Sequence, residues 1–371
     1  MFRKRELLGD KKMNVVIRTD ASNEIGTGHV MRCLTLAKQL KRHGAKVTFV
    51  CRSFEGHLHS YLRDQDMSVK LIPYTTGANE ADLQWTKENW MLDAEQTITI
   101  IEESSQKVDL LIVDHYGLDR YWENKLRHYT KYIMVIDDLA DRKHDCDIIL
   151  DNTFGITEEK YSGLLTSQTI GLYGVKYCLL REQFKKNQKS SFRYDYRCIK
   201  VHMFFGGIDF KNYTTKYSKF ILKNFQNVKI MAVVGSTFGY QDDLNELKKK
   251  YKERFQWEMA VKDMAAHMNK CDIALGAPGT ATWERACIGL PSAYFSVNKN
   301  QVPILEELEK NNFCMFLGEA SNTSEKTFIL EFNKFISSAE LLNTLFIKNT
   351  KCIDGKGTER IVEVLSRLIQ R

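Results

Sequence analysis

Short runs of β-branched and aliphatic residues recur along this chain, and most are followed by a longer amphipathic segment. This alternation is typical of βα units, which wind into mostly parallel sheets. Several runs end in polar residues, as expected for buried parallel strands whose carboxyl ends open onto a crevice. In the first half we expect a helix from about 28 to 43 and strands at 14–20, 45–51, 68–73, 109–116, 132–139 and 146–151.

The pattern is interrupted between 181 and 200, where the chain is polar, basic and without clear periodicity. Strands are expected again at 199–207, 228–235, 256–261, 271–277 and 291–297, followed by a last amphipathic helix from about 357 to 371. A chain of 371 residues that is 43% hydrophobic can bury two cores. We therefore predict two similar-sized, Rossmann-like α/β domains facing a cleft, with a basic N-terminal extension (1–12), an N-terminal domain (13–182), a linker (183–198) and a C-terminal domain (199–371).

Composition excludes several classes of protein. The net charge of +7 is spread thinly, which fits anionic small molecules better than a nucleic-acid groove. Nine cysteines form no C-x-x-C pair, so neither a zinc ribbon nor a disulfide framework is indicated. The start of the chain lacks the apolar core of a signal peptide, and no apolar run approaches the ~20 residues needed to span a bilayer. We expect a cytoplasmic protein that binds neither nucleic acid nor membrane.

Three expected strand ends carry glycines before a helix. These are "GTGH" (26–29), "FGGID" (205–209) and "GAPGTATWE" (276–284). Such loops bring backbone N–H groups and the positive end of a helix against an anion, so together they favour a phosphorylated or nucleotide ligand. The dinucleotide fingerprint fails, because Met31 stands where its third glycine should be, and no G-K-[S/T] occurs. The candidate ligand contacts are Gly26, Gly28, Gly206, Gly207, Gly279 and Thr280.

His29 is the candidate general base. It falls in the first turn of the expected helix, off the apolar face, and Arg32 is its i, i+3 neighbour. Both side chains can therefore project toward the crevice at the carboxyl end of the preceding strand. The positive end of the helix disfavours imidazolium, so we expect a neutral His29 that can accept a proton. The alternative is a polar histidine that helps to cap the turn.

Other polar residues near the strand ends have structural alternatives. Asp114 and His115 can tune the charge of the crevice, although a strand-end aspartate is often a cap. Tyr116 can hydrogen-bond substrate or pack between domains. Glu284 can bind ligand or serve only as a partner of the helix dipole. His144 and the following Asp-Cys-Asp could bind a metal, but the stretch is more typical of a polar turn.

Taken together, the ordered motifs resemble the UDP-2,4-diacetamido-2,4,6-trideoxy-β-L-altropyranose hydrolases of pseudaminic acid biosynthesis. The motifs are "RTDASNEIGTGHVMRCLTLA", "VDHYGLD", "VIDDLADR", "DIILDN", "YGVKYCLLR", "FFGGID", "GAPGTATWERACIGLPS" and "VNKNQ". The resemblance runs from about Met13 to the C-terminus. "MFFGGID" departs from the usual text of the family, which has a serine before the double glycine.

The resemblance implies a glycosyltransferase-B-like fold with UDP held mainly by the C-terminal domain. It implies that water replaces UDP at the anomeric carbon with inversion, without a metal or cofactor. By matching positions, His29 is the base, Tyr116 and Asn300 lie around the sugar and the reacting centre, and Glu284 grips the ribose. Gln301, beside Asn300 in "VNKNQ", is a further substrate contact. Two other functions stay open: a glycosyltransferase with a UDP-sugar donor, and a non-catalytic nucleotide-sugar-binding protein.

Overall fold

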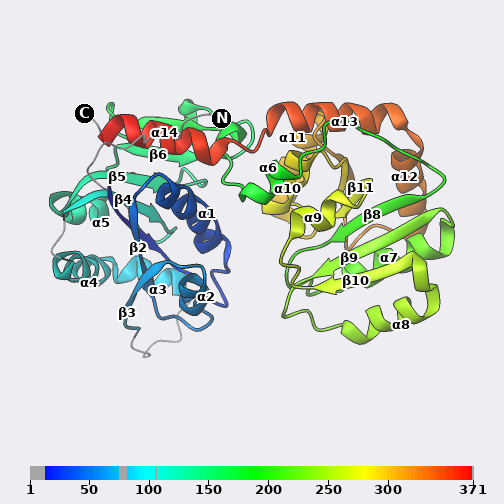
Figure 1. Ribbon diagram of the computed structural model, residues 1–371, viewed down its shortest axis with the longest axis horizontal. Coiled ribbons are helices and arrows are strands. Elements are labelled where there is room, and N and C mark those ends of the chain that lie inside the picture. The colour runs from blue at the N-terminus through cyan, green and yellow to red at the C-terminus, as the bar shows by residue number, and fades with distance from the viewer. Residues whose placement is uncertain (1–12, 75–81, 105–106, 370–371) are drawn as a thin grey trace. The chain divides into compact units, whose positions relative to one another are not determined.

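The computed structural model describes residues 13–74, 82–104 and 107–369, and these form two compact units. The first unit consists of the chain up to Leu179 together with Lys356 onward, and the second runs from Leu180 to Gly355. Each unit is built on one parallel sheet with helices on it, so the predicted α/β fold with two domains is confirmed (Figure 1). The expected extension at 1–12 lies outside the described residues.

The first unit has a seven-stranded sheet in the order β3-β2-β1-β4-β5-β6-β7, with every neighbouring pair parallel. Its strands are β1 (Asn14–Thr19), β2 (Lys46–Arg52), β3 (Ser68–Ile72), β4 (Val108–Asp114), β5 (Thr130–Ile136), β6 (Ile148–Asp151) and β7 (Ile170–Tyr173). Its helices are α1 (Gly28–Arg42), α2 (His59–Asp64), α3 (Asp82–Glu88), α4 (Trp90–Glu103), α5 (Arg120–Leu126) and α14 (Gly357–Ile369).

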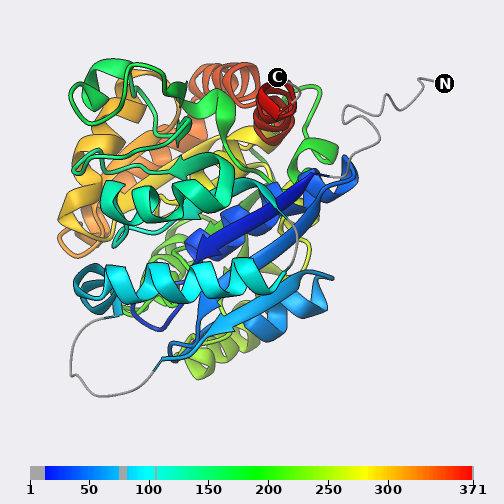
Figure 2. The same ribbon diagram turned by 90° about the vertical axis from the view of Figure 1, so that its left-hand side faces the viewer.

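This sheet has an apolar core on each face, because successive residues of a strand point to opposite faces. Val15 and Ile17 of β1 pack into the core that also contains residues of α1, α2 and α14. Val16 packs into the other core, together with residues of α4 and α5. Figure 2 shows the cyan helix α4 crossing in front of the blue strands. Both faces of this sheet are thus covered by helices.

The second unit has a six-stranded parallel sheet in the order β10-β9-β8-β11-β12-β13. Its strands are β8 (Ile199–Phe204), β9 (Val228–Val234), β10 (Phe255–Met259), β11 (Ile273–Gly276), β12 (Ser292–Ser296) and β13 (Met315–Glu319). Its helices are α6 (Glu182–Lys186), α7 (Tyr213–Asn224), α8 (Gln241–Tyr251), α9 (Met264–Asn269), α10 (Thr280–Ile288), α11 (Val302–Lys310), α12 (Glu325–Ser337) and α13 (Ala339–Cys352). Its core is rich in aromatic side chains from β12, α7 and α12, together with Phe205 just after β8.

The predicted domain boundaries need two corrections. The C-terminal helix belongs to the first unit, because Ile361, Val362 and Leu365 of α14 pack into the core shared with α1. The expected linker at 183–198 belongs to the second unit and contains most of α6, whose Phe184 is fully buried. The chain therefore passes from one unit to the other twice, after Leu179 and after Gly355.

Candidate functional site

The first group of candidate residues lies at the carboxyl edge of the first sheet. β1, β4 and β5 are neighbours there, and Thr19 pairs with Asp114 at the last position of the β1–β4 ladder. The loop after β1 leads into α1, and the loops after β4 and β5 follow alongside. Residues from three separate stretches of sequence are therefore brought together by the strand order.

His29 is the second residue of α1, and its side chain is oriented by Asp114. His29 Nδ1 lies 2.6 Å from Asp114 Oδ1, and the histidine is only 8% exposed. A carboxylate accepts the Nδ1 proton, which assigns the neutral tautomer whose Nε2 carries a lone pair. Within the described residues Nε2 has no hydrogen-bond partner. The arrangement is that of a general base oriented by a third group.

Arg32 binds the same carboxylate from the other side. Its Nε lies 2.6 Å from Asp114 Oδ2 and one terminal nitrogen lies 2.6 Å from Oδ1. That nitrogen is also 3.2 Å from His29 Nδ1. Both atoms are donors here, so they do not hydrogen-bond to each other, and both donate to Asp114 Oδ1. Burial opposes ionisation of Asp114, yet Arg32 and His29 outweigh it and hold its pKa well below the usual range. Asp114 is therefore ionised at physiological pH.

Tyr116 completes this side of the site. Its ring meets the His29 ring edge to face with centroids 4.5 Å apart, and its hydroxyl donates to Asp138 Oδ1 at 2.6 Å. Burial and the Asp138 carboxylate raise the pKa of the phenol, so Tyr116 stays neutral at physiological pH. Because its proton is used by Asp138, the oxygen of Tyr116 is left to accept a hydrogen bond.

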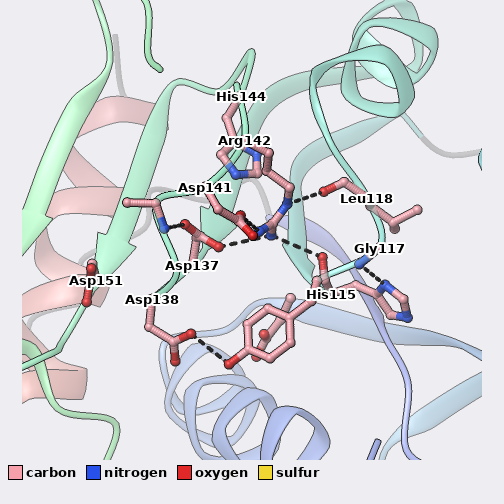
Figure 3. A network of polar contacts seen from close by, with 12 residues as sticks. His115, Gly117, Leu118, Asp137, Asp138, Asp141, Arg142, His144 and Asp151 are labelled. Carbon is pink, nitrogen blue, oxygen red and sulfur yellow. Dashed lines mark hydrogen bonds and ion pairs between the residues drawn. The ribbon is translucent and has the colours of Figure 1, made fainter. Parts of the chain in front are cut away.

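Asp138 is a residue of the site that the sequence did not single out. It lies two residues beyond β5 (Figure 3). Its carboxylate accepts from Arg32 at 3.0 Å, and its side chain retains 26% exposure. The preceding Asp137 turns the other way and is fully buried against Arg142, at 2.9 Å. Both aspartates belong to the motif "VIDDLADR", so the sequence does show acidic residues at this strand end. Which of the two contacts Arg32 depends on where β5 ends, and the sequence alone does not define that residue.

The predicted substrate contacts at Asp114 and His115 need correction. Asp114 is 0% exposed, and its carboxylate is engaged by His29 and Arg32, so it orients these two side chains and has no surface open to a ligand. His115 is 3% exposed, accepts from the Gly117 amide through Nδ1, and points Nε2 toward Asp20 at 3.3 Å. Both side chains point away from solvent.

The first unit also contains a buried charge network. Arg18 of β1 bridges Asp20 and Asp93, each at 2.6 Å, and Arg52 of β2 reaches Asp93 at 2.6 Å. All four side chains are 0% exposed. Buried charges are tolerated only when paired and hydrogen-bonded, and here Trp122 adds an N–H donor to Asp93 at 3.0 Å. The network links β1, β2 and α4.

The second group of candidates lies at the carboxyl edge of the second sheet. Gly206 and Gly207 follow β8, and Gly279 immediately precedes α10. A Cβ added at any of the three would meet no atom within 4 Å. Gly206 and Gly279 also have positive φ values of 102° and 130°, which favour glycine. These loops are open to a ligand, and the exposed Thr280 begins the helix beside them.

The remaining candidates in this unit differ in how they are held. Glu284 of α10 is largely buried and paired with Arg181 at 2.9 Å. Asn300 is exposed in the turn after β12. Gln301 uses its side-chain oxygen to accept from the Val297 amide at 2.9 Å, so that atom fixes the turn. The structure thus brings the proposed base and Tyr116 together in the first unit, and Gly206, Gly207, Gly279 and Glu284 at one edge of the second.

No group of three or more His, Cys, Asp or Glu side chains that could hold a metal ion is found among the described residues. His144, considered above beside Asp145, instead pairs with the buried Glu123 at 2.6 Å. Glu123 also accepts from the Asp145 amide at 2.5 Å. This local structure is that of the polar turn considered in the sequence. The helices in the described part of the chain include none long and apolar enough to cross a membrane.

Comparison with known proteins gives distant relatives, and no family model matches the chain. It is 28% identical over 227 residues to UDP-2,4-diacetamido-2,4,6-trideoxy-β-L-altropyranose hydrolase of Campylobacter jejuni, covering 61% of this chain and 70% of that protein. It is 24% identical to the spore coat polysaccharide biosynthesis protein SpsG of Bacillus subtilis, covering 97% and 99%. An uncharacterised protein of Methanocaldococcus jannaschii is 25% identical, and this chain spans 66% of its length.

Solved structures share the fold. MurG of Acinetobacter baumannii matches with a TM-score of 0.68 and 13% identity, covering 96% of this chain and 100% of that one. LpCGTa in complex with UDP matches with a TM-score of 0.68 and 11% identity, covering 96% and 99%. The chain therefore has the GT-B fold of two parallel-sheet α/β domains, and it is a distant relative of the altropyranose hydrolase and of SpsG.

Proposed function

We propose that this protein is a UDP-sugar hydrolase that releases a 2,4-diacetamido-2,4,6-trideoxy sugar of altrose configuration from UDP, in nonulosonic (pseudaminic) acid biosynthesis. The observation that carries the proposal is the contact of His29 Nδ1 with Asp114 at 2.6 Å, which leaves Nε2 to accept a proton. A protein that only binds a nucleotide sugar has no use for such an oriented base. The choice of sugar rests on the ordered motifs and the distant similarity to the Campylobacter hydrolase.

In this proposal the first unit supplies the base. Nε2 of His29 takes a proton from water while the water oxygen bonds to the anomeric carbon. The bond from that carbon to the diphosphate oxygen breaks on the opposite face, and its electron pair leaves with UDP, which gives inversion. Asp114 stabilises the imidazolium that forms, and the oxygen of Tyr116 accepts from the sugar. Asn300 is assigned to the reacting centre by its place in "VNKNQ".

The second unit supplies the UDP site. The open loop at Gly206 and Gly207 and the N-terminus of α10 offer backbone N–H groups to the diphosphate. Preorganised donors of this kind stabilise the charge that develops on the leaving group, which is the task that a divalent ion performs in other enzymes. Glu284 is assigned to the ribose hydroxyls.

A glycosyltransferase that uses a UDP-sugar donor is the second candidate. It is favoured by the fold match to MurG and by the similarity to SpsG. Both reactions use the same base and the same leaving group, and they differ in whether water or a hydroxyl of an acceptor attacks. UDP release at full rate without an acceptor supports the hydrolase, whereas release that depends on an added acceptor supports the transferase.

The base is tested by His29→Asn with His43→Asn as its matched control. His43 caps the far end of the same helix, where its Nδ1 contacts the Gln39 carbonyl at 2.9 Å. Loss of a positioned base typically costs about 10²–10⁴ in rate, so His29→Asn is expected to lose most turnover while it still binds UDP. UDP is followed by chromatography and the released anomer by NMR. Unchanged turnover in His29→Asn would overturn the assignment.

A further inference from the structure

Glu284 is held by a residue that has no assigned role. Arg181 lies immediately before α6, two residues after the chain enters the second unit. One terminal nitrogen of its guanidinium donates to Glu284 Oε1 at 2.9 Å. The glutamate side chain is 12% exposed and that of Arg181 is 36% exposed. Oε2 of Glu284 has no hydrogen-bond partner within the described part of the chain.

Arg181 is itself fixed from two sides. Its guanidinium lies over the ring of the buried Phe184, 5.0 Å from the centroid. With the Gln183 amide oriented to satisfy both of its neighbours, its oxygen accepts from Arg181 at 3.2 Å and its nitrogen donates to Asp263 at 3.1 Å. A guanidinium held in this way presents its remaining N–H groups in a set direction.

Two opposing effects act on the charge of the Glu284 carboxyl. Burial raises the pKa of this carboxyl, and Arg181, with a smaller contribution from Arg285, acts against that rise. Cys287 of α10 interacts electrostatically with Glu284, with Asp354 and with Lys185 of α6. His267 of α9 faces His202, at 3.2 Å. The net effect is a pKa above the usual value, and Arg181 is the main cation that favours the ionised form of Glu284.

We propose that Arg181 is a positioning residue of the nucleotide site: it fixes Glu284 as a carboxylate through Oε1 and leaves Oε2 to accept from the ribose diol. The inference rests on the proposed UDP site. It gives a function to the last residue of the motif "YGVKYCLLR". A carboxylate accepts hydrogen bonds from a hydroxyl more strongly than a protonated carboxyl does, so loss of Arg181 weakens ribose recognition without removing any ligand contact.

The test measures binding of UDP and 2′-deoxy-UDP by calorimetry between pH 6 and pH 9. Wild type is expected to prefer UDP over the deoxy analogue by about tenfold or more, the discrimination typical of a hydrogen bond to a charged group. Glu284→Gln loses this preference. Arg181→Ala is expected to reduce it most at the acid end of this range and least at the basic end, because loss of the guanidinium raises the pKa of the Glu284 carboxyl further. Arg181→Lys restores part of it at pH 6.

Arg197→Ala is the matched control. Arg197 forms an exposed pair with Asp195 before β8, at the amino end of the same sheet, so its loss is expected to leave both affinities unchanged. Wild-type preference in Arg181→Ala, with the wild-type pH profile, would overturn the inference while leaving the UDP site intact. Failure of wild type to bind UDP would instead overturn the proposed function. Thermal melting of each variant shows whether a change in binding comes from misfolding. If Arg181→Ala does not fold, the same binding measurements on Arg181→Lys test the inference.

Discussion

Gly235 packs directly against the backbone of Gly207, so that a Cβ built on Gly235 would lie 2.1 Å from the Gly207 carbonyl oxygen. The loop after β8 therefore rests on the loop after β9, at the edge where we place the diphosphate of UDP. Gly207 itself has open space on its Cβ side. Packing of the fold therefore requires a glycine at 235, whereas at 207 the packing leaves space that a ligand can use.

Gly207→Ala is expected to fold with near wild-type stability but to bind UDP at least tenfold more weakly, because the methyl group enters space that we assign to the diphosphate. Calorimetry and thermal melting check the two halves of this prediction. Gly239→Ala is the control, since its Cβ also meets no atom within 4 Å. An equal loss of affinity in both variants would mean that the Gly207 position has no special relation to the ligand.

Asp114→Asn is expected to lower turnover by about 10²–10⁴ while leaving UDP affinity unchanged. An asparagine has an NH2 group in place of one carboxylate oxygen, and that donor would face either Nε of Arg32 or Nδ1 of His29, both of which are donors themselves. Asp64→Asn, an exposed carboxylate of the same unit, is the control. Steady-state kinetics with calorimetric UDP binding checks the prediction, and a loss confined to KM would contradict it.

Acid is expected to destabilise the first unit. Burial opposes ionisation of Asp20, Asp93 and Asp114, but their arginine partners outweigh it and lower each pKa. Between these lowered pKa values and the ordinary carboxyl pKa of about 3.9, the unfolded chain binds more protons than the folded one. The stabilisation therefore begins to be lost as pH falls toward about 3.9 and is lost fully only below the lowered pKa values. Each unit of pKa depression corresponds to about 1.4 kcal/mol. Urea unfolding at pH 7, 5, 4 and 3 measures this, and equal stability at pH 5 and pH 3 would contradict it.

Leu365→Ala is expected to destabilise the first unit by about 2–5 kcal/mol, because the leucine is fully buried in the core that α14 shares with α1. Leu368→Ala, at a partly buried position of the same helix, should cost less. Chemical denaturation followed by a probe in each unit resolves the transitions. If only the second unit responded to Leu365→Ala, the assignment of α14 would be wrong.

The sequence predicted the βα order and most strands, because buried parallel strands are continuous apolar runs. It missed β7 and β13, which lie at sheet edges and are only partly buried, so their apolar pattern is short. It placed His29 and Arg32 side by side from helical spacing alone. It could not foresee Asp138 or Arg181, since their partners are 106 and 103 residues away and meet them only through the tertiary fold.

The double passage of the chain makes the second unit an insertion within the first. Gly357 packs against the backbone that leads to Leu179, where a Cβ would lie 2.3 Å from the Cys178 carbonyl oxygen. The two cut ends of the first unit are therefore adjacent in space. A short turn joining 179 to 356 would excise the insertion and leave His29, Asp114 and α14 in one continuous chain. Simple truncation after 182 would instead remove α14, which packs with α1 in the same core.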